Sequence, residues 1–459
     1  MASSARLVAD TVRRTVSTVL TDRGVIVVAG VLAAATPVVP LVRQLGARDV
    51  LVVALSTGTG DLPDPSLCTC LVTASARPAP TIDKEIRCWQ EFVDSPPRDV
   101  RAAVDRFDPA GEAVVAVLIP VTLDDGYLGR ATYGGRPPGY TLLEDKTTND
   151  TLWAAAGVVQ APYTVVPTEE TDLCSAAEAL DAGQGTVWSA DARDSWSGGG
   201  GRVWWVRSVE HAEEATAAVH RCARQVRIMP FLEGVPCSIH GLVLPDGVAV
   251  FRPVELLVFR TPTLKFCFAG VSTWWDPPLA DRQEMRVVAR RTGAHLDAIC
   301  GYRGAFCVDG VLTRDGFRPT ELNPRFSAGL NVIAASWPDL PLRWAHDLAV
   351  RGVDLGVSAS DVEEAMTARA DAHRVGVAQA APPRGTADTT DGVEVVLPSS
   401  AHGKLEIGPS THGVFVQFTP ADLVVGQRLA PIACEAFAEA NRRWDVGFPP
   451  LDPAPEMRR

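Results

Sequence analysis

The chain has 459 residues, 46% of them hydrophobic and 21% charged. This composition is ordinary for a folded protein, and the length predicts about three domains rather than one core. A formal net charge of −12 argues against a nucleic-acid partner, because binding a phosphate backbone needs clustered basic residues.

The cysteines and the longest apolar run indicate a cellular compartment. The ten cysteines are scattered, and only Cys68 and Cys70 are close together. No secretory signal pattern opens the sequence, so we expect reduced thiols and a cytoplasmic protein. The apolar run at 25–39 is interrupted by Pro37 and is too short to span a bilayer, so we expect no membrane partner.

Strands alternate with helices in the first part of the chain. Apolar runs at 24–30, 49–55 and 113–120 predict buried strands, and their alternation with helices indicates a parallel, doubly wound sheet. Residues 56–60 follow the second strand and are either a phosphate or substrate loop or a plain turn. A Pro- and Gly-rich loop at 134–139 predicts a domain boundary near residue 140.

The middle of the chain predicts a second mixed unit. Asp145 and Lys146 precede a helix that ends at Gly157, and a strand is expected over 158–166. The elements expected next are a helix over 172–182, strands at 185–190 and 203–207 on either side of a tetraglycine at 198–201, a helix over 209–224 capped by Ser208, and strands at 237–244 and 248–254. A helix opening near Asp281 then leads into Tyr302.

The segment 302–325 reads YRGAFCVDGVLTRDGFRPTELNPR. Two apolar runs flank Thr-Arg-Asp-Gly, which predicts a β-hairpin. A three-residue loop with Gly316 in the left-handed conformation would pair Thr313 with Phe317. That register places Asp309 opposite Glu321, on the same face of the sheet.

Oxygen ligands converge on this face of the predicted hairpin. Asn323 lies on the same face as Glu321, because side chains alternate along a strand. Two carboxylates and one amide oxygen suit Mg²⁺, which takes few protein ligands and leaves positions for phosphate oxygens. Arg325 could place its guanidinium beside those phosphates. The pattern therefore outlines a magnesium–nucleotide site, and a solvent-exposed hairpin is the simpler alternative.

The motif Glu-x-Asn-x-Arg, with an acid twelve residues earlier and Arg-Gly-Ala at 303–305, resembles the ATP-grasp superfamily. The Asp-Lys pair at 145–146, with the helix and strand after it, resembles the segment that opens the ATP-grasp nucleotide domain. The resemblance implies a mixed α/β fold with ATP and Mg²⁺ as cofactors. It implies a doubly wound domain at 1–140, an ATP-grasp domain at 141–352 with its lid at about 150–228, and a small α/β cap at 353–459.

The resemblance also implies roles for individual residues. The metal ligands would be Asp309, Glu321 and Asn323. Nucleotide contacts would come from one lysine, two lid glycines and the segment that links the halves of the pocket, namely Lys146, Gly199, Gly200, Met229, Phe231, Leu232 and Glu233. Arg325 and Lys265 would be the catalytic cations that hold the transferred phosphate. A surface lysine is the alternative for Lys146, and a solvated edge-strand lysine is the alternative for Lys265.

The sequence departs from the superfamily at one lid position. Ser189 stands about where relatives carry a second lysine that contacts phosphate. Arg193 or Arg202 could supply the missing charge. A chain without this lysine could also be a nucleotide-binding regulator that has lost catalysis, although the intact metal set and Arg325 argue against that reading.

The last part of the chain carries no recognisable chemistry. The expected elements are a helix over 340–351, an Ala-, Pro- and Thr-rich linker at 375–392, strands at 393–398 and 413–418, and a helix over 431–443. They can form the small cap against the catalytic cleft.

The resemblance implies an ATP-dependent carboxylate–amine ligase that acts through an acylphosphate. The domain order is similar to that of single-chain peptide ligases of the pheganomycin type, which implies peptide-bond formation in antibiotic biosynthesis. Its partners would be a small-molecule carboxylate and the amine of an amino acid or peptide, and a homodimer stays open. A bicarbonate-using enzyme of the biotin-carboxylase kind is the alternative within the superfamily.

Overall fold

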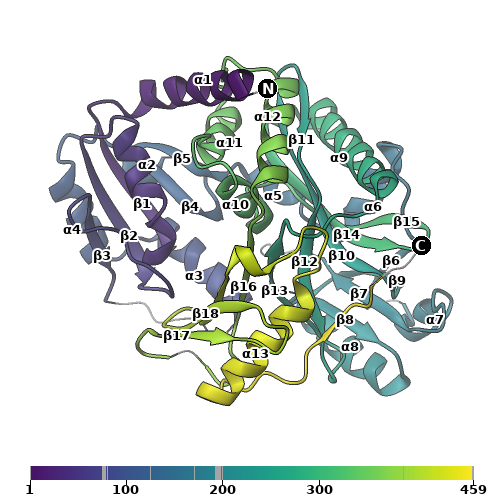
Figure 1. The fold of residues 1–459 in the computed structure, drawn as a ribbon. Coiled ribbons are helices and arrows are strands. Elements are labelled where there is room, and N and C mark those ends of the chain that lie inside the picture. The colour runs from purple at the N-terminus through teal and green to yellow at the C-terminus, as the bar shows by residue number, and fades with distance from the viewer. Residues whose placement is uncertain are drawn as a thin grey trace.

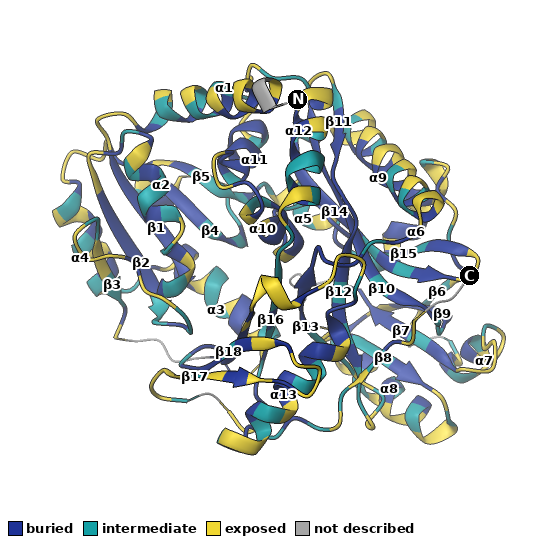
Figure 2. Ribbon diagram, in the orientation of Figure 1, coloured by how far each residue is buried: buried dark blue, intermediate teal, exposed yellow. Residues whose placement is uncertain are grey.

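The computed structural model describes residues 2–456 except 75–78, 80, 125, 170, 192–197, 199 and 386. Three sheets follow one another along the chain, with helices packed around them (Figure 1). Buried residues line the strands, while exposed residues gather on the outer faces of helices such as α9 (Leu279–Cys300) and α13 (Ala430–Trp444) (Figure 2). Within these described residues, no helix combines the length and apolar character needed to cross a bilayer.

The first sheet is parallel and has the strand order β3-β2-β1-β4-β5. Its strands are β1 Gly24–Val31, β2 Asp49–Ser56, β3 Thr69–Val72, β4 Val114–Thr122 and β5 Ala131–Arg136. The helices of this part are α2 Val38–Gln44, α3 Ile82–Asp94 and α4 Arg98–Phe107, with short 3-10 turns at Leu32–Ala35 and Tyr127–Gly129. β1 is buried almost throughout because its alternate side chains enter two different hydrophobic clusters, one on each face of the sheet, which explains its unbroken apolar run. The three strands predicted for this part are confirmed as β1, β2 and β4.

A long helix that the sequence reading did not include precedes this sheet. α1, Ala2–Leu20, buries Val8, Val12, Val16 and Leu20, which recur every fourth residue. This spacing places them on one helix face. That face lies in one hydrophobic cluster with β1, β2 and the helices α11 and α12 from the other end of the chain.

The second sheet is antiparallel and has the order β6-β9-β7-β8. Its strands are β6 Thr164–Pro167, β7 Thr186–Ala190, β8 Val203–Val206 and β9 Gln225–Pro230. The helices of this part of the chain are α5 Pro138–Leu142, α6 Lys146–Ala155, α7 Leu173–Glu178 and α8 Val209–Cys222. The strand predicted over 158–166 is wrong for its first part, since the ladder begins at Thr164; Pro162 has no N–H to donate. Ser208 caps α8 as predicted, accepting from the backbone N–H of His211 at 3.4 Å.

The third sheet is antiparallel and runs β15-β14-β10-β12-β13-β16-β19-β18-β17, with β11 beside β10 and β20 beside β12. Its strands are β10 Val235–Leu244, β11 Gly247–Val250, β12 Val254–Arg260, β13 Phe266–Ser272, β14 Gly304–Thr313, β15 Gly316–Asn323, β16 Gly376–Ala380, β17 Asp391–Val396, β18 His402–Ile407, β19 Val414–Phe418 and β20 Asp452–Pro453. The helices of this part are α9 Leu279–Cys300, α10 Ala328–Ala335, α11 Leu342–Val350, α12 Ala359–Ala372 and α13 Ala430–Trp444, with a 3-10 turn at Pro420–Asp422.

The strands near the C-terminus extend this third sheet. β16 pairs with β13, placing Ala378 opposite Gly270, and β19, β18 and β17 follow outward. The linker predicted at 375–392 is therefore wrong for its first part, which is the strand β16. Its alternating small side chains fit a half-buried strand, which the Ala- and Pro-rich composition concealed.

Candidate functional site

The hairpin of β14 and β15 brings Asp309 opposite Glu321, as predicted. The predicted loop is wrong in detail, because Thr313 pairs with Gly316 rather than with Phe317. Gly316 has the positive φ expected of it, +106°. A register shift beside Asp309 leaves one extra residue on β15, and this bulge restores the pairing of the two acids.

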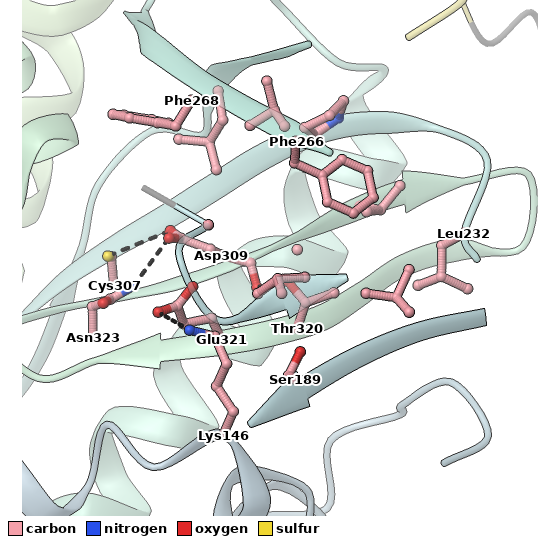
Figure 3. Close-up of a pocket in the computed structure, with 18 of the residues that line it drawn as sticks. Lys146, Ser189, Leu232, Phe266, Phe268, Cys307, Asp309, Thr320, Glu321 and Asn323 are labelled. Carbon is pink, nitrogen blue, oxygen red and sulfur yellow. Dashed lines mark hydrogen bonds and ion pairs between the residues drawn. The ribbon is translucent and has the colours of Figure 1, made fainter. Parts of the chain in front are cut away.

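The acids form a cluster with Asn323 and Cys307 on one face of the hairpin (Figure 3). The amide of Asn323 donates to one oxygen of Asp309 at 3.0 Å, and the thiol of Cys307 contacts the other at 3.5 Å. Burial, together with the negative charge of Glu321, raises the pKa of Asp309 to about 6. A nearby cation would stabilise the ionised form of this carboxyl group.

Lys146 supplies a cation at this cluster. Its Nζ lies 2.8 Å from an oxygen of Glu321, and both side chains are largely buried. Lys146 is the first residue of α6, which Asp145 caps by accepting from the backbone N–H of Thr147. The buried Asn149 fixes this helix to β15, because its oxygen accepts from the backbone N–H of Leu322 at 3.0 Å.

Arg325 lies beside the cluster and is held by two acceptors. Its Nε donates to Glu144 at 2.6 Å, and its Nη2 donates to Asn323 at 2.8 Å. Glu144 also forms an ion pair with Arg136 of β5. Burial alone would raise the pKa of Glu144, but the two guanidinium groups outweigh it and hold that pKa below its usual value. Arg325 is thus oriented by an ion-paired, buried carboxylate.

A cavity of about 330 Å³ runs past these residues. Its first end is formed by the end of β9 and the segment after it, where the lining residues include four that the sequence analysis singled out, namely Met229, Phe231, Leu232 and Glu233. Phe231 stacks on Trp205 of β8 with ring centroids 4.3 Å apart, and Phe266 lies nearly parallel to both rings. The sequence reading did not include Trp205 or Phe266, although aromatic residues on adjacent segments were a usable signal.

The glycine-rich segment lies at the cavity on the β7–β8 side. Gly198 and Gly200 line the cavity, and Gly200 has a φ of +78° that favours glycine. Gly199 and Arg193, singled out from the sequence, lie outside the described residues. Arg202 is buried, donates to the backbone of Asp191 and is not among the lining residues.

Ser189 occupies the lid position at which the resemblance led us to expect a lysine. Ser189 lines the cavity and lies directly opposite Arg227 on the neighbouring strand. The guanidinium of Arg227 also reaches the cavity lining, but it forms a buried ion pair with Asp150 of α6, 2.7 Å from Nη2 to the carboxylate. Within the described part of the chain, the cations at this cluster are therefore Lys146, which contacts Glu321, and Arg325, which contacts Asn323.

The structure does not bring Lys265 to this cluster. The residue lies in the exposed turn before β13, where its backbone N–H donates to the hydroxyl of Thr261, and it is not among the cavity's lining residues. Arg260, the last residue of β12, does line the cavity and forms ion pairs with Glu233 and with Asp452 near the C-terminus. Ala454, near the C-terminus, also lines the cavity.

The second end of the cavity lies at the start of α10. Ser327, Ala328 and Gly329 line it, together with the buried His240 of β10. A Cβ on Gly329 would lie 2.2 Å from Nε2 of His240, so only glycine permits this contact. Burial lowers the pKa of His240 to about 3, so the imidazole is neutral at neutral pH. Nothing in the local sequence indicated His240, which belongs to an otherwise apolar strand.

The sequence matches no protein-family model and no curated protein. Solved structures resemble the fold at low identity. The biotin carboxylase domain dimer of the Hydrogenobacter thermophilus 2-oxoglutarate carboxylase, in complex with MgADP, ADP and bicarbonate, is 13% identical over 86% of each chain, with a TM-score of 0.54. Phosphoribosylamine–glycine ligase from Thermotoga maritima is 14% identical, covers 91% of this chain and 96% of its own, and has a TM-score of 0.52.

A third structure, the carboxyaminoimidazole ribonucleotide synthase of Aspergillus clavatus complexed with ATP, is 13% identical. It covers 93% of this chain and 98% of its own, with a TM-score of 0.50. These neighbours are ATP-grasp proteins, and the mixed α/β ATP-grasp fold expected from the sequence is confirmed.

Proposed function

We propose that this protein is an ATP-dependent ligase that joins a small-molecule carboxylate to an amine and releases ADP and phosphate. The observation that supports it best is the convergence of Lys146 and Arg325 on Asp309, Glu321 and Asn323 within one cavity of an ATP-grasp fold. Of the three structures of the same fold, one is described as a ligase, one as a synthase complexed with ATP, and one as a biotin carboxylase domain in complex with MgADP, ADP and bicarbonate.

The residues at the acid cluster fit Mg²⁺. Their donors are carboxylate and amide oxygens, the hard ligands that this ion prefers. In the described part of the chain, no group of three or more His, Cys, Asp or Glu side chains could enclose a metal. Two carboxylates with one amide instead leave positions for phosphate oxygens and water, and Asp309, Glu321 and Asn323 would be the protein ligands. Bound there, Mg²⁺ would neutralise charge on the phosphates.

The proposed reaction has two steps. A carboxylate oxygen of the substrate attacks the γ-phosphorus, and the bond from that phosphorus to ADP breaks. Lys146 and Arg325 would hold the phosphate oxygens in line during this transfer. The amine then attacks the acyl carbon of the acylphosphate, the acyl C–O bond breaks, and inorganic phosphate leaves as the nitrogen loses a proton. The segment around Gly198 and Gly200 would exclude water, which otherwise hydrolyses the acylphosphate.

We extend the proposal to the substrates that the domain order implies. The amine would belong to an amino acid or to the N-terminus of a peptide, so that the product is a peptide bond, and the setting would be the biosynthesis of a peptide antibiotic in the cytoplasm. Support for this finer proposal is the order of the segments before and after the nucleotide-binding part of the chain. It is separable from the general ligase reaction, which rests on the acid cluster.

Hydroxylamine trapping tests the ligase reaction without knowledge of the amine. Incubation with MgATP, hydroxylamine and a panel of carboxylic acids that includes bicarbonate should yield ADP in step with a hydroxamate of one organic acid. Glu321→Gln should abolish both products while the circular dichroism spectrum is kept, because it removes only the charge beside the metal position. Glu214→Gln, an exposed change on α8, is the matched control. ADP release that is the same with and without acid would contradict the proposal.

A further inference from the structure

The cavity has two ends of different character on either side of the acid cluster. Phe266 belongs to the nucleotide end, since it lies beside the rings of Phe231 and Trp205. Phe268, only two residues later, packs instead against the hydrophobic cluster that contains the helix α10. Figure 3 shows Phe268 on the side of Cys307 and Leu232 at the opposite end. The strand β13 therefore contributes to both ends.

An apolar wall closes the end near α10. Leu256 and Val258 of β12 lie opposite Val271 and Phe268 of β13, and all four side chains line the cavity. Three of them are only partly buried, and Val271 is buried. The wall therefore offers apolar area that a ligand would remove from water.

A bulge in β13 builds this wall. One residue lies between Leu256 and Val258, but two lie between Phe268 and Val271. Gly270 takes up the extra residue with a φ of +133°, and a Cβ there would lie 2.1 Å from the backbone oxygen of Val377. Without the bulge Val271 would face the opposite side, where Ala269 is buried in another core. The fold therefore turns both apolar side chains of β13 toward the cavity.

Beside the apolar wall, the end near α10 is polar and contains one positive charge. Arg325, Asn323, Ser327 and Gly329 line this side together with the neutral imidazole of His240. Among the described residues that line this end, the carboxylates are those of the acid cluster alone. An anionic group would find a cation here, whereas an ammonium group would find only carboxylates assigned to the metal.

These observations define a substrate class and rest on the proposed ligase function. In that reaction the carboxylate that accepts the phosphoryl group must lie beyond the γ-phosphate, on the far side of the acid cluster from the adenine base. We infer that the carboxylate substrate carries an aromatic or branched apolar substituent, seated against Leu256, Phe268 and Val271, and has no free ammonium group. Its carboxylate would face Arg325. The acid is thus either a simple carboxylic acid or an amino acid whose nitrogen is acylated.

The experiment measures hydroxamate formation by the full-length protein with matched acids. 3-Phenylpropanoate and N-acetylphenylalanine should have kcat/KM values at least about tenfold above those of phenylalanine, which adds an ammonium group, and of succinate and bicarbonate. Succinate, bicarbonate or phenylalanine reacting as well as the apolar acids would overturn the inference while leaving the ligase proposal intact. Absence of acid-dependent ADP release with every acid would overturn both.

Variants of the wall connect this preference to the cavity. Leu256→Gln and Phe268→Gln should each reduce the ratio of the apolar to the polar acid by about tenfold, because the substituent loses its apolar contact. Val396→Gln, an apolar-to-polar change on the exposed strand β17, should leave that ratio unchanged. Calorimetry should give each variant the MgADP affinity of the wild type, which would establish that the variant is folded and that its nucleotide end is intact. A ratio that stays the same in both wall variants would place the acid elsewhere and refute the assignment.

Discussion

The ion pair of Lys146 and Glu321 gives the sharpest prediction about nucleotide binding. The two charged atoms are 2.8 Å apart, and the side chains are 13% and 26% exposed, so solvent screens this pair only in part. In the proposed complex the ammonium contacts phosphate oxygens instead. A charge-assisted hydrogen bond of this kind contributes about 2 kcal/mol. Lys146→Ala should therefore raise the Kd for MgADP about 30-fold.

Isothermal titration calorimetry at fixed ionic strength measures this change directly. Lys84→Ala on the exposed face of α3 is the matched control, since it removes an equal charge from a residue that does not line the cavity, and its Kd should equal that of the wild type. Circular dichroism establishes that Lys146→Ala has folded. A Kd within twofold of the wild-type value in a folded variant would refute the assignment of Lys146 to the phosphates and return it to a purely structural ion pair.

Three further predictions concern other parts of the molecule. Glu144→Ala should lower the free energy of unfolding by about 3–5 kcal/mol in urea titrations, because it leaves two buried guanidinium groups without their shared carboxylate; an unchanged midpoint would contradict this. Burial raises the pKa of Asp347 to about 7, so the stabilising contribution of this residue is present at low pH and is lost as the pH rises toward and through 7. The Tm of Asp347→Asn minus the Tm of the wild type should therefore increase from pH 5.5 to pH 8. A Tm difference that does not change with pH would contradict this role of the buried Asp347. Truncation after Leu451 removes Ala454 from the cavity lining and Asp452 from its ion pair with Arg260, and should weaken MgADP binding about tenfold, whereas Arg442→Ala on the exposed face of α13 should not.

The sequence predicted the hairpin and its acids because both depend on local patterns. Alternation places Glu321 and Asn323 on one face whatever the loop does. The loop itself could not be fixed, since a shorter turn followed by a bulge gives the same pairing of Asp309 and Glu321 as the predicted longer turn. The shorter loop shifts the register by one residue and the bulge on β15 shifts it back, so the predicted pairing of Asp309 with Glu321 is still correct.

Contacts between distant segments could not be predicted in the same way. Glu144 joins Arg136 and Arg325 only because two parts of the fold meet there, and no local pattern in the sequence signals such a buried ion pair. The resemblance implied a catalytic role for Lys265, but the residue lies in the turn that begins at Thr261 and is not among the residues that line the cavity. Spacing along a strand predicts position only where no turn or bulge intervenes.

The apolar wall of the cavity shows the same limit. Val271 faces the cavity because Gly270 takes up one extra residue, and a regular strand would have turned Val271 away. A glycine inside a strand does indicate a bulge, yet it does not give the face on which the next side chain emerges. The side chains that would select the acid therefore required the three-dimensional structure.

The central claim is that a carboxylate attacks the γ-phosphorus of ATP at the acid cluster. Oxygen transfer measures this step directly: an acid substrate labelled with ¹⁸O in its carboxylate is turned over with MgATP and hydroxylamine, and the products are analysed by mass spectrometry. Attack at the γ-phosphorus predicts ADP as the nucleotide and one ¹⁸O in inorganic phosphate, because the attacking oxygen stays on phosphorus when the nucleophile displaces it. AMP as the nucleotide product, carrying the label, would contradict both the mechanism and the roles assigned to Asp309, Glu321 and Asn323.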